Sequence, residues 1–268
     1  MSSYLIADSG GTHTDWCFIN TNCACHYFET ESYHPDNWSD DFFARTAEYW
    51  KEYPEMRASK LLFYGAGCLN ESNAIRQESI FKEIGFSDVS VRSDLHAAGI
   101  ACLGDKSGKV AIMGTGSVLF DWQDGSVQNV IGGKGHQSGD QGSGYYFGKL
   151  IHDAHLLNRL TEEQSRLFVE LVDLAAINDN LKSGLSHIAY LLKDHKNIFN
   201  HFHRINSKAF YTKHLKQSST KSINVLGGYA YYHVSIIREE LNKYDVQIVK
   251  ILKAPISEMV EQIVALNE

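Results

Sequence analysis

The sequence predicts an α/β protein of two lobes. Three short apolar runs near the N-terminus, at 4–7, 16–20 and 25–30, are joined by polar turns and predict an antiparallel meander. The same strand and turn pattern returns between 110 and 131. Strands and helices alternate after each meander, as they do in α/β layers. A chain of 268 residues is also long enough for two hydrophobic cores.

The first lobe is expected over 1–107. Its later elements are predicted as a helix capped by Ser39, a buried strand at 61–64, a helix that ends at Gly85, a strand at 88–91, and an alanine-rich helix that begins at Ser93 or Asp94.

The second lobe is expected over 108–268, with a helical insertion at about 150–216. Within the insertion, Thr161 and Gln164 have the spacing of a capping box, and apolar stripes predict core-facing helices. The lobe is completed by a strand at 222–226, a helix to about Leu241, a strand at 246–252 and a final helix after Pro255.

Composition excludes several classes of protein. The formal charge of −7 disfavours a nucleic-acid partner, which requires clustered Lys and Arg. No apolar run is long enough to cross a membrane, and no secretory signal is visible, so we expect a cytoplasmic protein. The five cysteines form neither a disulfide framework nor CxxC pairs.

The segment from Asp8 to Thr14, D-S-G-G-T-H-T, lies between the first two predicted strands. Paired glycines let backbone N–H groups approach phosphate oxygens, hydroxyls add donors, and Asp8 can hold Mg²⁺ through its water shell. The alternative is an ordinary hairpin turn. The predicted phosphate contacts are Gly10, Gly11, Thr12, His13 and Thr14.

A second hydroxyl turn, Gly114-Thr115-Gly116-Ser117, occupies the same place in the second meander. If the lobes are related by a pseudo-twofold axis, the two turns hold one polyphosphate from both sides of a cleft. The alternative is coincidence between two hairpins.

Three further features are candidates for ligand contacts. The glycine-rich segment 132–144 predicts a loop that wraps a small polar molecule, with a flexible linker as the alternative. Gly227 and Gly228 follow a strand and suit a flat adenine. Asp94, at a strand-to-helix junction, is a candidate general base, although Asp is also a good helix N-cap.

The ordered set of motifs resembles N-acetylglucosamine kinase and the related BadF/BadG/BcrA/BcrD-type ATPases over essentially the whole chain. The set consists of D-x-G-G-T-x-T at 8–14, Asp94 before Ala97-Ala98, G-T-G-S at 114–117, G-G-x-G at 132–135, G-D-x-G-S-G at 139–144, and Gly-Gly at 227–228. This family belongs to the actin, sugar kinase and heat-shock chaperone superfamily. The resemblance implies two ribonuclease-H-like lobes around a central nucleotide cleft.

The resemblance also implies roles for residues. The turns at 10–14 and 114–117 bind the phosphates of ATP, and Gly227 and Gly228 bind its adenosine. Asp94 activates the sugar 6-hydroxyl. The implied substrate contacts are Asp94, Gly67, Thr115, Gly132, Gly133, Asp140, His34 and Asn37.

The sequence departs from the family pattern on the sugar side. Gln141 stands where the family usually has Glu, and the segment 33–35 stands near a sugar loop that commonly contains Asn. A third departure is Ser257-Glu258, where a glycine commonly follows. The first two departures lie on the sugar side, so they leave the sugar less well defined than the phosphoryl donor.

We therefore expect an ATP- and Mg²⁺-dependent kinase of the 6-hydroxyl of an amino sugar, first of all N-acetylglucosamine. One alternative is an activator-type ATPase, which the scattered cysteines disfavour because its iron–sulfur chemistry needs a cysteine ligand set. Another is a non-catalytic sugar or nucleotide sensor, which the presence of Asp8 and Asp94 disfavours. The preferred sugar and the oligomeric state, with a homodimer among the options, stay open.

Overall fold

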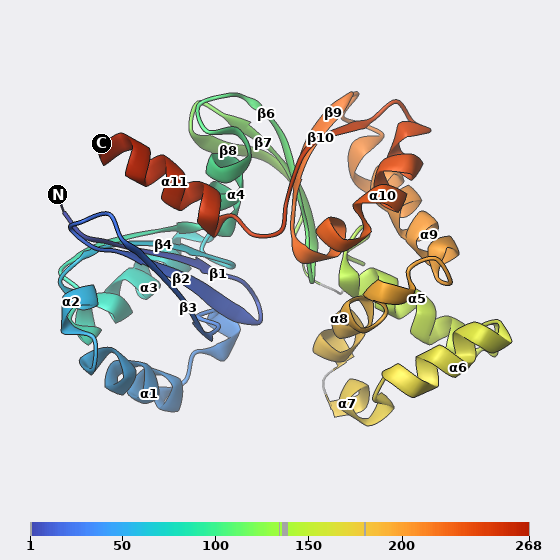
Figure 1. The fold of residues 1–268 in the computed structure, drawn as a ribbon, viewed down its shortest axis with the longest axis horizontal. Coiled ribbons are helices and arrows are strands. Elements are labelled where there is room, and N and C mark those ends of the chain that lie inside the picture. Colours follow the sequence, from blue (N-terminus) through green and yellow to red (C-terminus); the bar gives the residue numbers. More distant parts are fainter. Residues whose placement is uncertain (1, 134, 136–138, 180, 268) are drawn as a thin grey trace. The chain divides into compact units, whose positions relative to one another are not determined.

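The computed structural model describes residues 2–133, 135, 139–179 and 181–267. The chain divides into two compact units. Unit 1 is the chain up to Gly104 together with the segment from Pro255 onward, and unit 2 is Asp105–Ala254. Each unit contains one five-stranded mixed sheet (Figure 1).

The sheet of unit 1 has the strand order β3-β2-β1-β4-β5. Its strands are β1 (Tyr4–Ser9), β2 (His13–Ile19), β3 (Cys25–Glu31), β4 (Lys60–Gly65) and β5 (Asp88–Ser93). The first three form the predicted antiparallel meander, and β4 and β5 run parallel to β1.

Helices cover both faces of this sheet. One face packs its alternate apolar side chains against α1 (Asp40–Lys51), α2 (Pro54–Arg57) and α3 (Glu71–Ile84). The core between them is aromatic and includes Trp16, Trp50 and Phe81. The predicted caps are present: Ser39 accepts the N–H of Phe42, and Gly85 ends α3 at φ 109°.

The other face carries α4 (Asp94–Leu103) and α11 (Ile256–Asn267), which pack on each other. The sequence predicts the residues after 254 in the second lobe, whereas the structure packs α11 on α4, β1 and β2 of unit 1. The reason is the apolar stripe of α11, since Ile256, Met259 and Val260 are all buried there.

The sheet of unit 2 has the strand order β10-β9-β6-β7-β8. Its strands are β6 (Gly108–Met113), β7 (Ser117–Gln123), β8 (Ser126–Gly132), β9 (Ser222–Leu226) and β10 (Gln247–Leu252). The second predicted meander, β6 to β8, is again antiparallel, and β9 runs parallel to β6.

The helices of unit 2 include the predicted helical insertion. They are α5 (Gly144–Leu156), α6 (Glu162–Leu171), α7 (Leu174–Asp179), α8 (Leu181–Leu191), α9 (Asn200–Phe210) and α10 (Gly228–Asn242). The predicted capping box is confirmed, with Thr161 and Gln164 bonded reciprocally. Buried Phe147, Phe168 and Phe199 join these helices into one core with the sheet.

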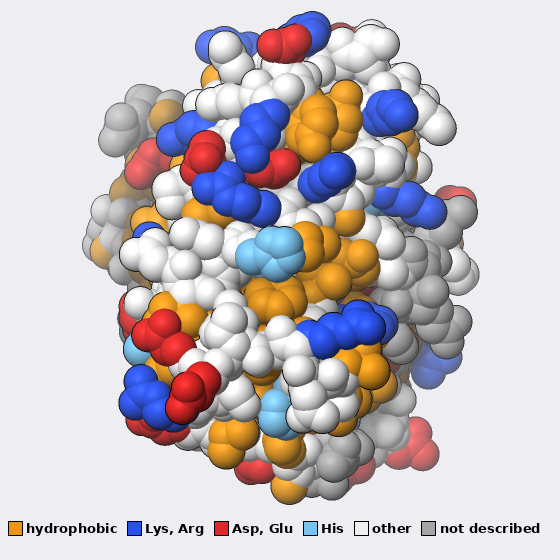
Figure 2. Space-filling model, turned by 90° about the vertical axis from the view of Figure 1, so that its right-hand side faces the viewer, with side chains coloured by type: hydrophobic (Ala, Val, Ile, Leu, Met, Phe, Trp, Pro, Cys, Tyr) orange, Lys and Arg blue, Asp and Glu red, His pale blue; other side chains and the backbone are white. Residues whose placement is uncertain are grey.

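No helix in the described part of the chain is long and apolar enough to cross a membrane. On the face drawn in Figure 2, Lys and Arg side chains lie among acidic and apolar ones rather than in a continuous basic surface. Unit 2 pairs cations with acids, as in Arg204–Glu239 at 2.8 Å.

Candidate functional site

Hydrogen bonds within the turn between β1 and β2, and from Thr14 to β3, fix the shape of this turn. Gly10 N–H donates to the carbonyl of His13 (3.0 Å). The buried Thr14 hydroxyl donates to the Glu31 carbonyl (3.1 Å) and lies 2.8 Å from Ser9 Oγ. The sequence predicts that Thr14 offers its hydroxyl to phosphate, but in the structure the hydrogen of that hydroxyl is donated to the Glu31 carbonyl of β3. Thr14 therefore shapes the turn, whereas Gly11 and Thr12 are exposed.

A row of carboxylates crosses the meander beside this turn. Asp8 lies opposite Asp15, and Asp15 lies opposite Glu29, so the three side chains share one face of the sheet. Burial raises the pKa of Asp8 to about 8, and repulsion from Asp94 and Asp15 adds to the rise. Asp8 thus sits where a cation would restore its negative charge.

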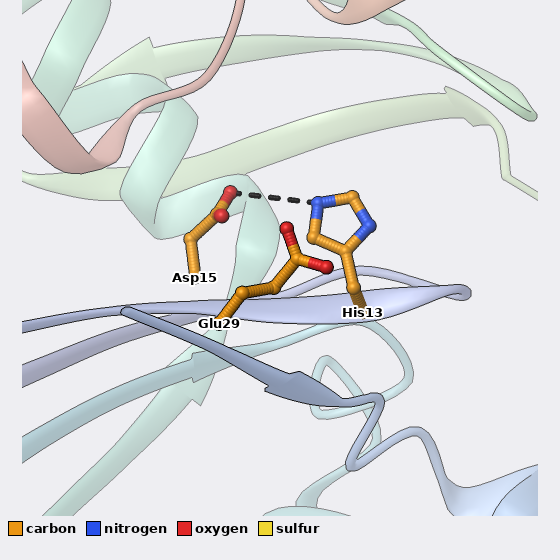
Figure 3. Close-up of side chains that lie close together, drawn as sticks. All are labelled: His13, Asp15 and Glu29. Atoms are coloured by element: carbon orange, nitrogen blue, oxygen red, sulfur yellow. Dashed lines mark ion pairs between the residues drawn. The ribbon is translucent and has the colours of Figure 1, made fainter. Parts of the chain in front are cut away.

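Oxygen-rich surroundings of this kind fit Mg²⁺, which prefers carboxylate and water ligands. Next to Asp8, the side chains of His13, Asp15 and Glu29 point off the same side of β2 and β3 (Figure 3). Their ligand atoms lie within 4.8 Å of one another, and His13 Nε2 is 3.6 Å from Asp15 Oδ2. The Asp15 carboxylate beside it raises the pKa of His13. This second group could also hold a cation.

Asp94 is the first residue of α4, and Ser93 is the N-cap residue. Its Oδ1 accepts the N–H of Leu95 (3.0 Å). Burial raises the pKa of Asp94 to about 6, although the bonds from backbone N–H groups oppose the rise. A general base works best when its pKa lies near the working pH, so the position suits that role.

The three residues expected on the sugar side of unit 1 lie close together. A methyl carbon at Gly67 would lie 3.0 Å from Pro35 and 3.6 Å from His34 Nε2. Asn37, in the 3-10 turn Pro35–Asn37 (η1), donates from Nδ2 to the Ser32 carbonyl (3.1 Å). The β4–α3 loop and the segment after β3 therefore form one surface.

In unit 2, the turn at 114–117 is hydrogen-bonded to the Asp140 loop, residues 139–143, and to the first residues of α5. Gly144 N–H donates to the Gly114 carbonyl (2.8 Å), and Tyr145 N–H donates to the Thr115 carbonyl (3.2 Å). Ser117 donates from Oγ to the Gln141 carbonyl (2.7 Å). Its hydroxyl thus holds the loop, while Thr115 and Gly116 lie at the tip of the turn.

The other predicted segments of unit 2 meet the same turn. Gly133 N–H donates to the Ser117 carbonyl (3.1 Å), and Gly132 lies against that carbonyl. Gly227, at φ 124°, is pressed onto Met113 and Gly114, since a methyl carbon there would lie 2.7 Å from the Met113 carbonyl. Lys134 and residues 136–138 of the predicted loop lie outside the described residues.

Three glycines of these motifs have no steric reason to be glycine. Gly11, Gly114 and Gly228 lack a left-handed φ, and a methyl carbon at each would meet no atom within 4 Å. The fold would accept alanine there, in contrast to Gly227 or Gly142. A glycine that the fold does not need leaves room for a ligand to approach the backbone closely.

Sequence reasoning missed two residues that organise these segments. Ser9 Oγ accepts the N–H of Tyr33 (3.1 Å) and so ties the turn between β1 and β2 to the segment after β3. Asn206, in α9, bonds the Asp140 loop. The sequence does place Asn206 as a polar residue within an apolar helical pattern, which is a signal for a buried hydrogen-bonding side chain. That pattern does not identify the groups to which Asn206 bonds.

No family model matches the chain, and no curated protein matches it by sequence. Solved structures do. A candidate N-acetylglucosamine kinase from Porphyromonas gingivalis superposes with a TM-score of 0.85 at 21% identity and covers 96% of this chain and 97% of that one. A second candidate N-acetylglucosamine kinase, from Chromobacterium violaceum, has a TM-score of 0.73 at 17% identity, with 97% and 98% covered.

A glucokinase of the ROK family from Streptomyces griseus, solved with glucose and AMPPNP, has a TM-score of 0.64 at 14% identity, with 96% of each chain covered. At these identities the likeness concerns the fold alone. The resemblance found in the motifs is thus confirmed as a resemblance of structure, and the chain has the α/β fold of these sugar-kinase structures.

Proposed function

We propose that the protein is an ATP- and Mg²⁺-dependent kinase that phosphorylates the 6-hydroxyl of an amino sugar, with N-acetylglucosamine as the first candidate. The observation that carries the proposal is the set of unforced glycines, because Gly11, Gly114 and Gly228 each belong to a different predicted ATP-binding motif. Proteins of this fold that are described as sugar kinases support it.

In this proposal, the turns at 10–14 and 114–117 bind the phosphates through backbone N–H groups such as those of Gly11, Thr12, Thr115 and Gly116, because the N–H groups of Gly10 and Gly114 donate within their own turns. Gly227 and Gly228 contact adenosine. Asp8 holds Mg²⁺ through water, with Asp15 as the neighbouring carboxylate. Bound Mg²⁺ neutralises charge on the phosphates. Fixed donors of this kind favour phosphoryl transfer mainly by positioning and charge stabilisation.

Asp94 orients the sugar 6-hydroxyl and takes its proton as the oxygen attacks the γ-phosphorus. The bond between that phosphorus and the β–γ bridging oxygen breaks, and ADP leaves. Gly67, His34 and Asn37 in unit 1, and Thr115, Gly132, Gly133 and Asp140 in unit 2, are the proposed sugar contacts. The hydroxyls of Thr14 and Ser117 hold the binding segments in shape.

A coupled ADP-release assay tests this function. The panel should contain glucose, glucosamine, N-acetylglucosamine, N-acetylmannosamine and N-acetylmuramic acid, with and without Mg²⁺. We expect ADP release that requires a sugar and Mg²⁺, with N-acetylglucosamine among the better acceptors. Full hydrolysis without sugar would favour the activator-type ATPase, and no turnover with nucleotide still bound would favour the sensor.

A further inference from the structure

Two neighbouring side chains at the start of α4 are able to cap this helix, and the structure uses only one of them. Ser93 is the N-cap residue, with an extended backbone (φ −77°, ψ 157°), yet its hydroxyl makes no capping hydrogen bond. The N–H of Leu95 is accepted instead by Asp94 Oδ1 (3.0 Å). An N-cap serine ordinarily accepts the N–H of the second or third helical residue, and these are Leu95 and His96. Ser93 and Asp94 therefore compete for the N–H groups of one helix end.

The Ser93 hydroxyl is occupied by the side chain of the third residue of α4. Ser93 Oγ lies 2.9 Å from His96 Nδ1, which is hydrogen-bond distance. Burial, followed by the charge of Arg92, lowers the pKa of His96 and favours the neutral ring. A neutral ring with its hydrogen on Nε2 accepts the hydroxyl hydrogen at Nδ1. Ser93 is only 1% exposed, so this bond is shielded from water.

The bond from the Leu95 N–H matters for Asp94 in two ways. It fixes one carboxylate oxygen, and a group that takes a proton from a substrate works only when it is held in a defined orientation. It also favours the charged carboxylate, and so it opposes the rise in the pKa of Asp94 that burial causes. A hydroxyl that took this N–H would leave the carboxylate less fixed and less acidic.

Other titratable groups face Asp94 from the neighbouring elements of unit 1. Burial raises the pKa of Asp8, in β1, and the charge of Asp94 adds to the rise. The same two causes, in the same order, raise the pKa of Cys68, in the loop between β4 and α3. Substitutions at 93 and 96 leave both groups in place, so their influence on Asp94 is shared by all the variants below.

We propose that His96 and Ser93 are positioning residues: by binding the Ser93 hydroxyl, His96 reserves the Leu95 N–H for Asp94 and so holds this carboxylate toward the sugar 6-hydroxyl. The proposal rests on the proposed function for the role of Asp94. Neither positioning residue touches the reacting atoms. When His96 is removed, Ser93 becomes an ordinary N-cap and takes the N–H that Asp94 uses.

The test is a pair of variants with opposite expectations. His96→Leu removes the acceptor of the Ser93 hydroxyl and places a good helix former in α4. Ser93→Ala/His96→Leu also removes the competing hydroxyl, so Asp94 should recover the Leu95 N–H. A packing defect at position 96 would persist in the double variant, whereas the proposed effect would not.

Two further variants complete the set. His96→Ala, with and without Ser93→Ala, repeats the comparison without adding volume. His26→Leu, at an exposed position of β3, is the control for the loss of a histidine elsewhere in unit 1.

The first measurement needs no substrate. Carbon-13 NMR of the aspartate carboxyl groups gives the pKa of Asp94, whose signal is assigned by its absence in Asp94→Asn. We expect about 6 in the natural chain and in His26→Leu. In His96→Leu the pKa should be about one pH unit higher, because a hydrogen bond to the charged form is lost. In Ser93→Ala/His96→Leu it should return to the natural value.

The second measurement is kcat and KM against pH in the ADP-release assay with N-acetylglucosamine. A base must be unprotonated to act, so the acid limb of kcat/KM follows the pKa of Asp94 and should move to higher pH in His96→Leu. At a pH above this limb, kcat should still be lower by about 10-fold or more, with a smaller change in KM, because the base is misoriented. The double variant should recover most of kcat.

The outcomes distinguish the two proposals. If His96→Leu leaves the pKa of Asp94 and kcat unchanged, or if the double variant keeps the defects of the single one, the positioning role is wrong and the kinase is untouched. A shifted pKa with unchanged kcat at high pH also overturns the positioning role. If no sugar accepts phosphate yet the NMR pattern appears, the kinase is wrong and the competition for the Leu95 N–H stands.

Discussion

Replacing unforced glycines by alanine separates a ligand role from a folding role. Gly114→Ala and Gly228→Ala place a methyl group where no atom lies within 4 Å, on backbone that alanine adopts freely. The unfolded chain loses conformational freedom, so the free energy of unfolding should rise by about 0.4–1 kcal/mol or stay unchanged. Gly228 begins α10, where alanine is the better helix former.

The same substitutions should weaken nucleotide binding, although they leave the stability unchanged or raise it. A methyl group at either position keeps a phosphate or an adenine from the backbone, and a lost hydrogen bond to a charged group costs about 1.5–3 kcal/mol. That range corresponds to a Kd for Mg²⁺ and AMPPNP that is weaker by roughly 10- to 150-fold. Gly11→Ala should behave in the same way.

Gly227→Ala is the contrasting variant. Its φ of 124° and the approach of 2.7 Å to Met113 predict a loss of stability of about 1–3 kcal/mol. Urea unfolding and calorimetry with AMPPNP measure the two quantities separately. If Gly114→Ala and Gly228→Ala fold normally and bind AMPPNP as tightly as the natural chain, the inference from glycine to nucleotide is refuted.

Three further predictions concern other parts of the molecule. Asp94→Asn should lower kcat by about 10²-fold or more, while the protein melts normally and binds both ligands. The reason is that the amide keeps the bond to Leu95 but cannot take a proton. A variant that retains more than about half of kcat would show that Asp94 serves only as a residue at the helix end. Unit 2 should lose stability as the pH falls below about 6.5, because burial lowers the pKa of His203 to about 2 and of His233 to about 4, so the unfolded state binds more protons. The loss should reach about 1.4 kcal/mol per pH unit for each histidine, and His233→Phe should flatten the slope measured by urea unfolding between pH 7.5 and 5.5. Met259→Ala should destabilise unit 1 by about 2–5 kcal/mol, because Met259 is 1% exposed in the α11 contact; an unchanged unfolding midpoint reported by the tryptophans of unit 1 would contradict the packing of α11 there.

Much of the secondary structure followed from the sequence because its signals are local. The two meanders were visible as apolar runs separated by turns, and Ser39 and Gly85 marked helix ends with the side chain or the φ that such ends need. The grouping of Gly114–Ser117, the glycine-rich loop and Gly227 was also predicted, through the resemblance.

Tertiary structure alone decided what depends on distant partners. The apolar stripe of α11 predicts a buried face but not its partner, and the packing of α11 on α4, β1 and β2 assigns it to unit 1. The Thr14 hydroxyl points inward because Glu31 of β3 offers a carbonyl, which the turn sequence does not reveal. The partners of Asn206 lie more than sixty residues away along the chain. Which glycines the fold requires is likewise set by neighbours in space, since Gly227 meets Met113 while Gly228 meets nothing.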